Sequence, residues 1–242
     1  MAPTLFDWDA PGPYRVAFST RLGGVSEGPF ESLNLGVLTG DEPRRVRENR
    51  RRLLAAVGAD PGSATMARQV HGGRVVEADG GGVVTPGAVL QPCDGLWSDR
   101  PGRAMLLLTA DCFPVALALR DGGFRLALLH VGWRGLLAGI AAAGVRALAG
   151  GTVAAAIGPG IGPCCYEVGS DVRNRFAGSF GDEVIVGRNL DLAHATEKAL
   201  RAAGCDSVER TAICTACEAD LFFSHRRDRG VTGRQGVVAY VV

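Results

Sequence analysis

Short apolar runs without regular alternation of polar and apolar residues constrain the fold of this chain more than any other feature. A strand with one solvated face alternates, whereas continuous apolar runs are typical of strands that are covered on both faces. Such strands need helices or sheets packed on either side, so the pattern predicts an α/β fold. The runs are YRVAFST (14–20), AMLLLTA (104–110), PVALALR (114–120), FRLALLHVG (124–132), TVAAAIG (152–158), VERTAI (208–213) and GVVAYVV (236–242).

Three segments have the spacing of helices. The first begins after Asp41, the expected N-cap, has Pro43 in its first turn and ends at Gly58. The second, roughly 134–148, is rich in Leu and Ala and is expected to be buried, and the third covers about 190–203 before Gly204. Because no linker or change of composition divides the chain, residues 1–242 are expected to form a single domain.

The charge balance excludes several classes of partner. The chain has 26 basic and 25 acidic residues, a net charge of +1, and 6% aromatic residues, so we expect neither nucleic acid nor a membrane surface as a partner. The arginines between positions 44 and 52 are interpreted as a solvated helix face. The uncharged stretch 147–166 contains many Gly and Pro residues and is predicted to form a strand and turns rather than a membrane helix. The sequence does not indicate the oligomeric state.

The cysteines favour a reducing compartment. Their number, seven, is odd and their spacing is uneven, which argues against a disulfide framework and for a cytoplasmic protein. The first residues lack the apolar core of a signal peptide. The neighbours Cys164 and Cys165 are expected to be packed thiols, and the Cys214–Cys217 C-x-x-C pair is interpreted as structural because no second C-x-x-C pair accompanies it.

An acid and a thiol, Asp111 and Cys112, interrupt two apolar runs, and an aspartate is rarely buried without a partner. His71 and His130, two of four histidines, each precede glycines at what we expect to be strand ends. Two histidines and one cysteine could bind Zn²⁺ and leave a fourth position open, as in catalytic zinc sites. Alternatively, Cys112 could be a thiolate nucleophile with His130 as its base and Asp111 orienting the imidazole, which would leave His71 without a role.

Motifs in the same order over nearly the whole chain resemble the laccase-domain family, whose members are also labelled polyphenol oxidase, peptidoglycan editing factor and zinc-dependent purine nucleoside phosphorylase. The blocks are FSTRLGGVSEGPFESLNLG (18–36), QVHGGRVV (69–76), DGLWSDRPG (94–102), TADCFPVAL (109–117), HVGWRGLLAGI (130–140), AIGPGIGPCCYEVG (156–169), CT (214–215) and LFFSHRRDRGVTGRQG (221–236). Val131, Trp97, Ser98 and His225 depart from the usual residues, which affects the expected substrate preference rather than metal binding.

The resemblance implies a layered α/β sandwich with mixed β-sheets flanked by helices, similar to the catalytic domain of a deamidating toxin. It implies His71, Cys112 and His130 as metal ligands. Zinc is the expected cofactor, and copper is less expected because four histidines cannot supply a multicopper cluster.

The implied function is that of a purine nucleoside phosphorylase with adenosine deaminase activity, whose partners are a nucleoside and phosphate. Asp111, Cys112 and His130 are the candidate catalytic residues. The candidate substrate-binding residues are Arg21, Asn34, Glu167 and Arg226. The alternatives are an amidase-like enzyme that edits a UDP-linked muropeptide, a Cys/His thiolate hydrolase, and a metal-binding protein without catalytic activity.

Overall fold

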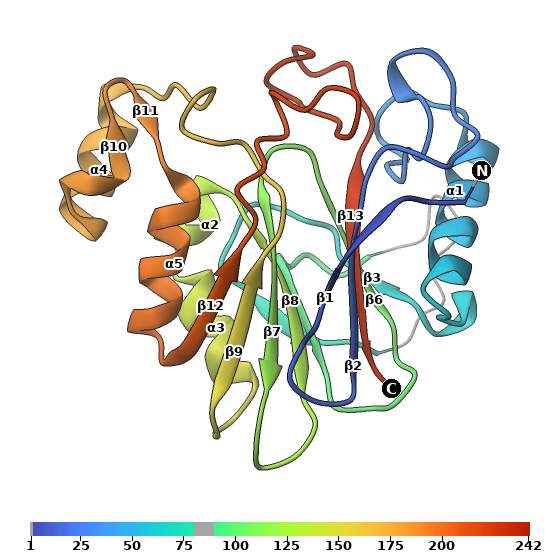
Figure 1. Cartoon of the computed structure of the whole chain (residues 1–242), viewed down its shortest axis with the longest axis horizontal. Helices are drawn as coiled ribbons and strands as arrows, with labels where there is room; N and C mark the ends of the chain where they lie inside the picture. Colours follow the sequence, from blue (N-terminus) through green and yellow to red (C-terminus); the bar gives the residue numbers. More distant parts are fainter. Residues whose placement is uncertain (1, 80–89) are drawn as a thin grey trace.

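The computed structural model describes residues 2–79 and 90–242, and within them two large sheets form the centre of the molecule (Figure 1). The first has the order β1 (Leu5–Trp8), β2 (Tyr14–Ser19), β13 (Gln235–Val241), β6 (Met105–Thr109) and β3 (Thr65–Met66). The second has the order β12 (Cys205–Arg210), β9 (Val153–Ile157), β7 (Phe113–Leu119), β8 (Leu126–Val131), β5 (Gly95–Ser98) and β4 (Val75–Glu77). Both sheets are mixed, since β3–β6, β4–β5 and β9–β12 are parallel pairs among antiparallel ones.

The two sheets pack face to face through an alternation of small and large side chains. On β7, Ala116 and Ala118 belong to the buried cluster between the sheets, together with Phe18 of β2 and Val237 of β13. The alternate β7 positions, such as Val115, belong to the cluster on the opposite face of the same sheet. Both faces of β7 are therefore buried, which explains why its sequence is apolar throughout.

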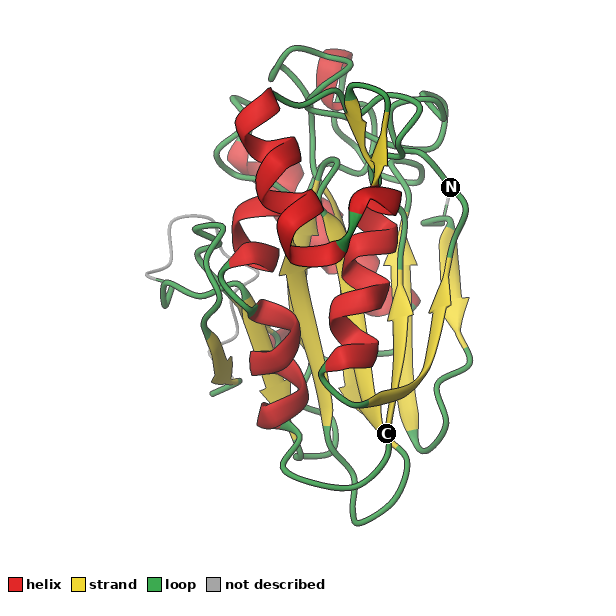
Figure 2. Cartoon of the chain, turned by 90° about the vertical axis from the view of Figure 1, so that its left-hand side faces the viewer, coloured by secondary structure: helices red, strands yellow, loops and turns green. Residues whose placement is uncertain are grey.

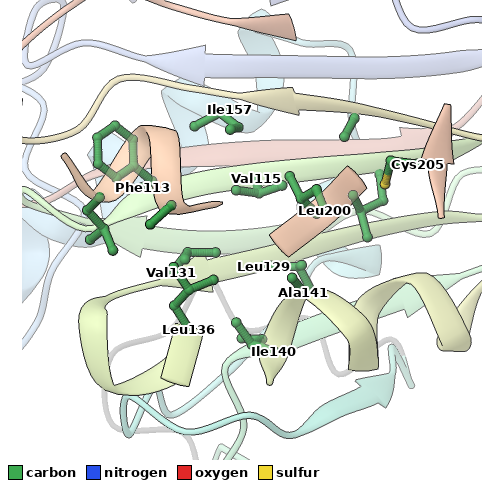
Figure 3. Close-up of a cluster of buried hydrophobic side chains, with 14 of the residues drawn as sticks. Phe113, Val115, Leu129, Val131, Leu136, Ile140, Ala141, Ile157, Leu200 and Cys205 are labelled. Atoms are coloured by element: carbon green, nitrogen blue, oxygen red, sulfur yellow. The ribbon is translucent and has the colours of Figure 1, made fainter. Parts of the chain in front are cut away.

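Helices cover the two outer faces. The first sheet is covered by α1 (Pro43–Ala56), whose Leu53 and Leu54 pack with Leu106 and Val238. The second sheet packs against α2 (Trp133–Leu137), α3 (Ile140–Ala147), α4 (Ser170–Phe180) and α5 (Leu192–Ala202). Figure 2 shows these helices in front of the strands, and Figure 3 shows their shared core, with Leu136, Ile140 and Leu200 against β7 and β8. The layers helix, sheet, sheet, helix confirm the expected α/β sandwich.

Several local predictions need correction. The segment expected as one helix over 134–148 divides into α2 and α3, because Gly139 adopts a left-handed φ of 82°. The N-cap of α1 is Glu42, whereas the Asp41 carboxylate accepts hydrogen bonds from Ser26 and Asn34. The sequence patterns also missed β1, β3, β4, β5 and α4, together with the hairpin β10 (Ile185–Val186) and β11 (Asn189–Leu190) and short 3-10 turns at Gly28–Phe30, Pro61–Ser63 and Asp182–Val184.

Apart from Ala147, the last residue of α3, segment 147–166 forms β9 and turns, as the sequence predicted. In the described part of the chain, no helix combines the length and the apolar character needed to cross a membrane.

Candidate metal centre and its surroundings

Three side chains from distant segments meet beside the loop that joins β6 to β7. The candidate ligand atoms of His71, Cys112 and His130 all lie within 4.8 Å of one another. The two imidazole rings stand edge to face with centroids 4.8 Å apart. Gly132 makes room for this approach, because a Cβ there would lie 3.0 Å from Cys112 Sγ and 3.1 Å from His71 Cδ2. The structure thus brings together the three residues predicted as metal ligands.

Asp94, fully buried directly before β5, holds both histidines. Its carboxylate accepts the backbone N–H groups of His71 at 2.8 Å and Gly72 at 2.6 Å. The same carboxylate bonds Nδ1 of His130 at 2.9 Å, which leaves Nε2 as the ring nitrogen available to a metal. His71 lies in a loop well beyond β3, with a positive φ of 61°, so the expectation that it ends a strand is wrong.

Charge coupling within the centre favours an ionised thiol. Burial raises the pKa of Cys112, but His130 and His71 lower it by more, to about 6. Burial lowers the pKa of His130, but the Cys112 thiolate and Asp94 raise it to about 9. The two shifts have the same cause, because each group favours the charged form of the other, and this coupling is the one that a cysteine nucleophile also uses.

The donor set fits zinc better than a copper cluster. Two nitrogens and one sulfur, supported by a carboxylate on one imidazole, match the three-ligand pattern of catalytic zinc sites. Neither His194, on α5, nor His225, beside Arg226, belongs to this group of ligand atoms. The described residues thus do not bring further imidazoles to this centre, as a multicopper site requires.

Asp111 joins three loops around the centre and has a positive φ of 90°. Its Oδ1 accepts a hydrogen bond from the Thr215 hydroxyl at 2.8 Å, and its Oδ2 accepts one from the backbone N–H of Arg226 at 2.7 Å. Its carbonyl oxygen accepts the N–H of Ile161 at 2.8 Å. Both carboxylate oxygens of this buried residue are therefore engaged within the chain.

Arginines and a tyrosine surround the same region. The Arg226 guanidinium lies 5.1 Å above the centre of the Tyr166 ring, and burial together with the charge of Cys112 raises the pKa of Tyr166 to about 12. Burial lowers the pKa of Arg234, and the charges of Asp111 and Cys112 oppose that shift, so all three groups are close. A cavity of about 470 Å³ opens beside Arg226 and is lined by Glu167, Val168, Gly169, Ser170, Arg173, Arg188 and Arg226.

Of the four predicted substrate-binding residues, the structure brings Glu167 and Arg226 together at this cavity, where the Glu167 carboxylate pairs with Arg188 at 2.7 Å. Asn34 is fully buried, and its amide bonds Gly36, Thr39, Asp41 and the backbone N–H of Arg234. Arg21 lies 4.7 Å above the Phe223 ring and donates to two backbone carbonyls.

The sequence patterns did not single out Asp94, Tyr166, Thr215 or Arg234. Tyr166 and Thr215 follow directly after cysteines, in the blocks CCYEVG and CT, which was the available indication. The expectation that Cys164 is a packed thiol is wrong, because this side chain is exposed, as is that of Cys217.

The comparisons with known proteins all indicate the same family. Residues 15–241 match the family model described as multi-copper polyphenol oxidoreductase laccase. A protein of Pseudomonas aeruginosa named purine nucleoside phosphorylase is 41% identical over 238 residues, covering 94% of this chain and 93% of that protein. Purine nucleoside phosphorylase YfiH of Escherichia coli is 35% identical, with 97% of each chain covered. The crystal structure of YlmD from Geobacillus stearothermophilus superimposes with a TM-score of 0.87 at 35% identity, covering 96% of this chain and 93% of that one.

Proposed function

Because the chain belongs to the multi-copper polyphenol oxidoreductase laccase family, and relatives similar over their full length are named purine nucleoside phosphorylase, we propose that it is a zinc-dependent purine nucleoside phosphorylase that also deaminates adenosine. The convergence of His71, Cys112 and His130 is the observation that supports this proposal most strongly. The multicopper cluster in the family's description finds little support, because two imidazoles and one thiol can bind only a single metal ion.

The metal would be held by His71, Cys112 and His130, with Asp94 fixing the orientation of the His130 ring. When bound, zinc supplies Lewis-acid polarisation and lowers the pKa of a water molecule, chemistry suited to deamination at C6 of adenine. His130 has its Nδ1 committed to Asp94, so the Asp94 carboxylate keeps this ring in one tautomer.

Phosphorolysis requires that a phosphate oxygen attack C1′ of the ribose while the C1′–N9 bond breaks and the base accepts a proton. The cavity with Arg173, Arg188 and Arg226 offers guanidinium groups, which bind phosphate through paired N–H donors. Arg226 belongs both to this cavity and, through its backbone N–H, to Asp111 beside the metal ligands. We assign phosphate binding to this cavity and proton transfer to Asp111.

The roles of the other predicted residues follow from their contacts. Glu167 balances the charge of Arg188 at the rim of the cavity. Asn34 positions the backbone of Arg234, and through it a second guanidinium near Asp111, rather than contacting substrate. Arg21 holds the loop at 219–223. The partners in this proposal are nucleoside and phosphate, without nucleic acid or membrane, and the seven unpaired cysteines suit action in the cytoplasm.

A Cys/His hydrolase is the second candidate, since His130 lowers the pKa of Cys112 and Cys112 raises the pKa of His130, which favours a thiolate beside an imidazolium. Alkylation separates the two functions. A metal ligand is shielded from iodoacetamide while zinc is bound and becomes reactive after chelation, whereas a nucleophile is inactivated in either state. Equal inactivation with and without zinc favours the hydrolase.

The direct test measures nucleoside turnover with and without phosphate. We expect ribose 1-phosphate from adenosine and inosine only when phosphate is present, and inosine from adenosine without it. Cys112→Ala should abolish both reactions, and His194→Gln, which alters a histidine on α5, is the matched control. Base release that is equal without phosphate would exclude a phosphorylase, and turnover of a UDP-linked muropeptide in place of nucleosides would establish the editing alternative.

A further inference from the structure

Four cysteines that the proposed reaction does not use form a second cluster. The sulfurs of Cys164, Cys165, Cys214 and Cys217 all lie within 4.8 Å of one another. They come from two loops, one after β9 and one after β12. Because β9 and β12 are parallel neighbours, their carboxyl ends lead into the same edge of the sheet. A parallel bridge between Gly160 and Cys214 continues this pairing into the loops.

Two of the distances between the sulfurs are close to those of a tetrahedral thiolate site. Cys217 Sγ lies 3.5 Å from Cys164 Sγ and 3.5 Å from Cys165 Sγ. In a tetrahedral site with Zn–S bonds of about 2.3 Å, the sulfurs stand about 3.8 Å apart. The two separations at Cys217 are therefore close to the value that a zinc ion imposes on its ligands, and the remaining pairs lie within 4.8 Å.

The surroundings also suit a bound cation. The backbone N–H of Gly162 donates to Cys214 Sγ at 3.2 Å, a contact that stabilises a thiolate. A Cβ at position 162 would lie 3.3 Å from Cys164 Sγ, so the glycine leaves space for the sulfurs. Cys164 and Cys217 are exposed, which gives an ion a route from solvent. Four cysteine sulfurs in tetrahedral arrangement are the ligand set of structural zinc.

We propose that Cys164, Cys165, Cys214 and Cys217 bind one Zn²⁺ in a structural site separate from His71, Cys112 and His130. The metal replaces the thiol protons and holds the loop after β9 against the loop after β12. This clamp has a consequence for the first centre, because Thr215, next to Cys214, donates to Asp111, and Tyr166, next to Cys165, lies beneath Arg226. The second zinc thus positions two residues in the wall of the first centre.

Metal content tests the proposal independently of any activity. Purified under reducing conditions with zinc, the wild-type protein should contain two zinc ions per chain. The double variant Cys164→Ser/Cys217→Ser should contain one, and its substitutions fall on exposed side chains. Cys112→Ala should also contain one, and the triple variant none. Equal zinc content in the wild type and the double variant would overturn the proposal, as would iron at this site.

A spectroscopic measurement assigns the remaining metal to its ligands. Cobalt-substituted Cys112→Ala should keep strong sulfur-to-cobalt charge-transfer absorption, because four thiolates still bind its metal. The double variant should show only the weaker absorption of a single thiolate. Mass spectrometry after alkylation should find Cys164 and Cys217 protected with zinc and modified after chelation. Ready alkylation of both in the zinc-loaded protein, or a disulfide between them, contradicts the proposal.

Discussion

Two buried aspartates lie beside the proposed metal ligands, and their contacts separate their roles. Asp94 bonds the His130 ring and the His71 backbone, so its effect on the reaction passes through the ligands. Asp111 bonds Thr215 and Arg226, which belong to the wall of the site. The sequence pointed to Asp111 because it adjoins Cys112, whereas Asp94 reaches His130 only through the pairing of β5 with β8. A contact of that kind cannot be read from residue spacing.

Asp94→Asn should weaken zinc binding while preserving the fold. The amide keeps the shape of the carboxylate but removes the negative charge that supports the His130 imidazole, and its NH2 group replaces one of the two acceptor oxygens. Altering such a supporting residue typically costs about 10- to 100-fold in metal affinity. Competition with a chromophoric chelator measures the loss, and Asp99→Asn, which removes an exposed ion pair with Arg125, is the control. Unchanged affinity in the Asp94 variant would show that its contact to His130 is dispensable.

Asp111→Asn should retain zinc and lose about 100-fold or more in turnover, the effect expected for a lost acid or base. Thr215→Val removes only a hydroxyl donor to the same carboxylate and should keep most of the turnover. Rates across a range of pH distinguish proton transfer from positioning, because only loss of a titrating group removes a limb of the profile. If Thr215→Val is as damaging as Asp111→Asn and both profiles keep their shape, Asp111 has a positioning role only.

At the scale of elements, the apolar runs predicted the central strands well, because burial of both faces leaves a direct trace in the sequence. The runs at 104–110, 114–120 and 152–158 correspond to β6, β7 and β9. The very short strands β3, β4 and β5 escaped prediction, since two to four residues do not establish a period. Likewise, the order of strands in a sheet depends on long-range packing. The sequence therefore did not reveal that β9 and β12 bring the cysteine pairs together.

Gly132→Ala should reduce zinc affinity by about tenfold or more, comparable to the loss of a ligand's supporting contact. Its φ of −95° suits alanine, so the effect comes from the Cβ, which would press on Cys112 Sγ and His71 Cδ2. Gly169→Ala is a matched control, because Gly169 also caps a helix in an extended conformation and a Cβ there would meet nothing within 4 Å among the described residues. Competition with a chelator should show a lower zinc affinity for Gly132→Ala than for Gly169→Ala. Equal affinities would mean that the turn before α2 shifts enough to accommodate the added Cβ without any loss of zinc binding.

For the whole molecule, we propose that residues 1–242 form one cooperative domain. The strand nearest the C-terminus, β13, lies between β2 and β6, so the first sheet needs both ends of the chain. The cluster between the sheets joins side chains of β2 and β13 to those of β7, β8 and β9. Neither sheet can lose its partner without exposing this cluster to water. The apolar runs predicted the layered arrangement. That β13 pairs with both β2 and β6 could be learned only from the structure.

Thermal unfolding tests the single domain and the bound metal together. We expect one transition in calorimetry, because separate domains would unfold in separate steps.

Zinc that binds only the folded chain adds about 2.7 kcal/mol to the free energy of unfolding when its free concentration is 100 times the dissociation constant. For a chain of this size, about 1 kcal/mol shifts Tm by about 2–4 °C, so each filled site should raise Tm by about 5–10 °C. Chelation should lower Tm of the wild type further than that of Cys164→Ser/Cys217→Ser, which keeps only the site at His71, Cys112 and His130, and added zinc should restore it. Two transitions, of which only one responds to zinc, would divide the chain into separate units and contradict the single domain.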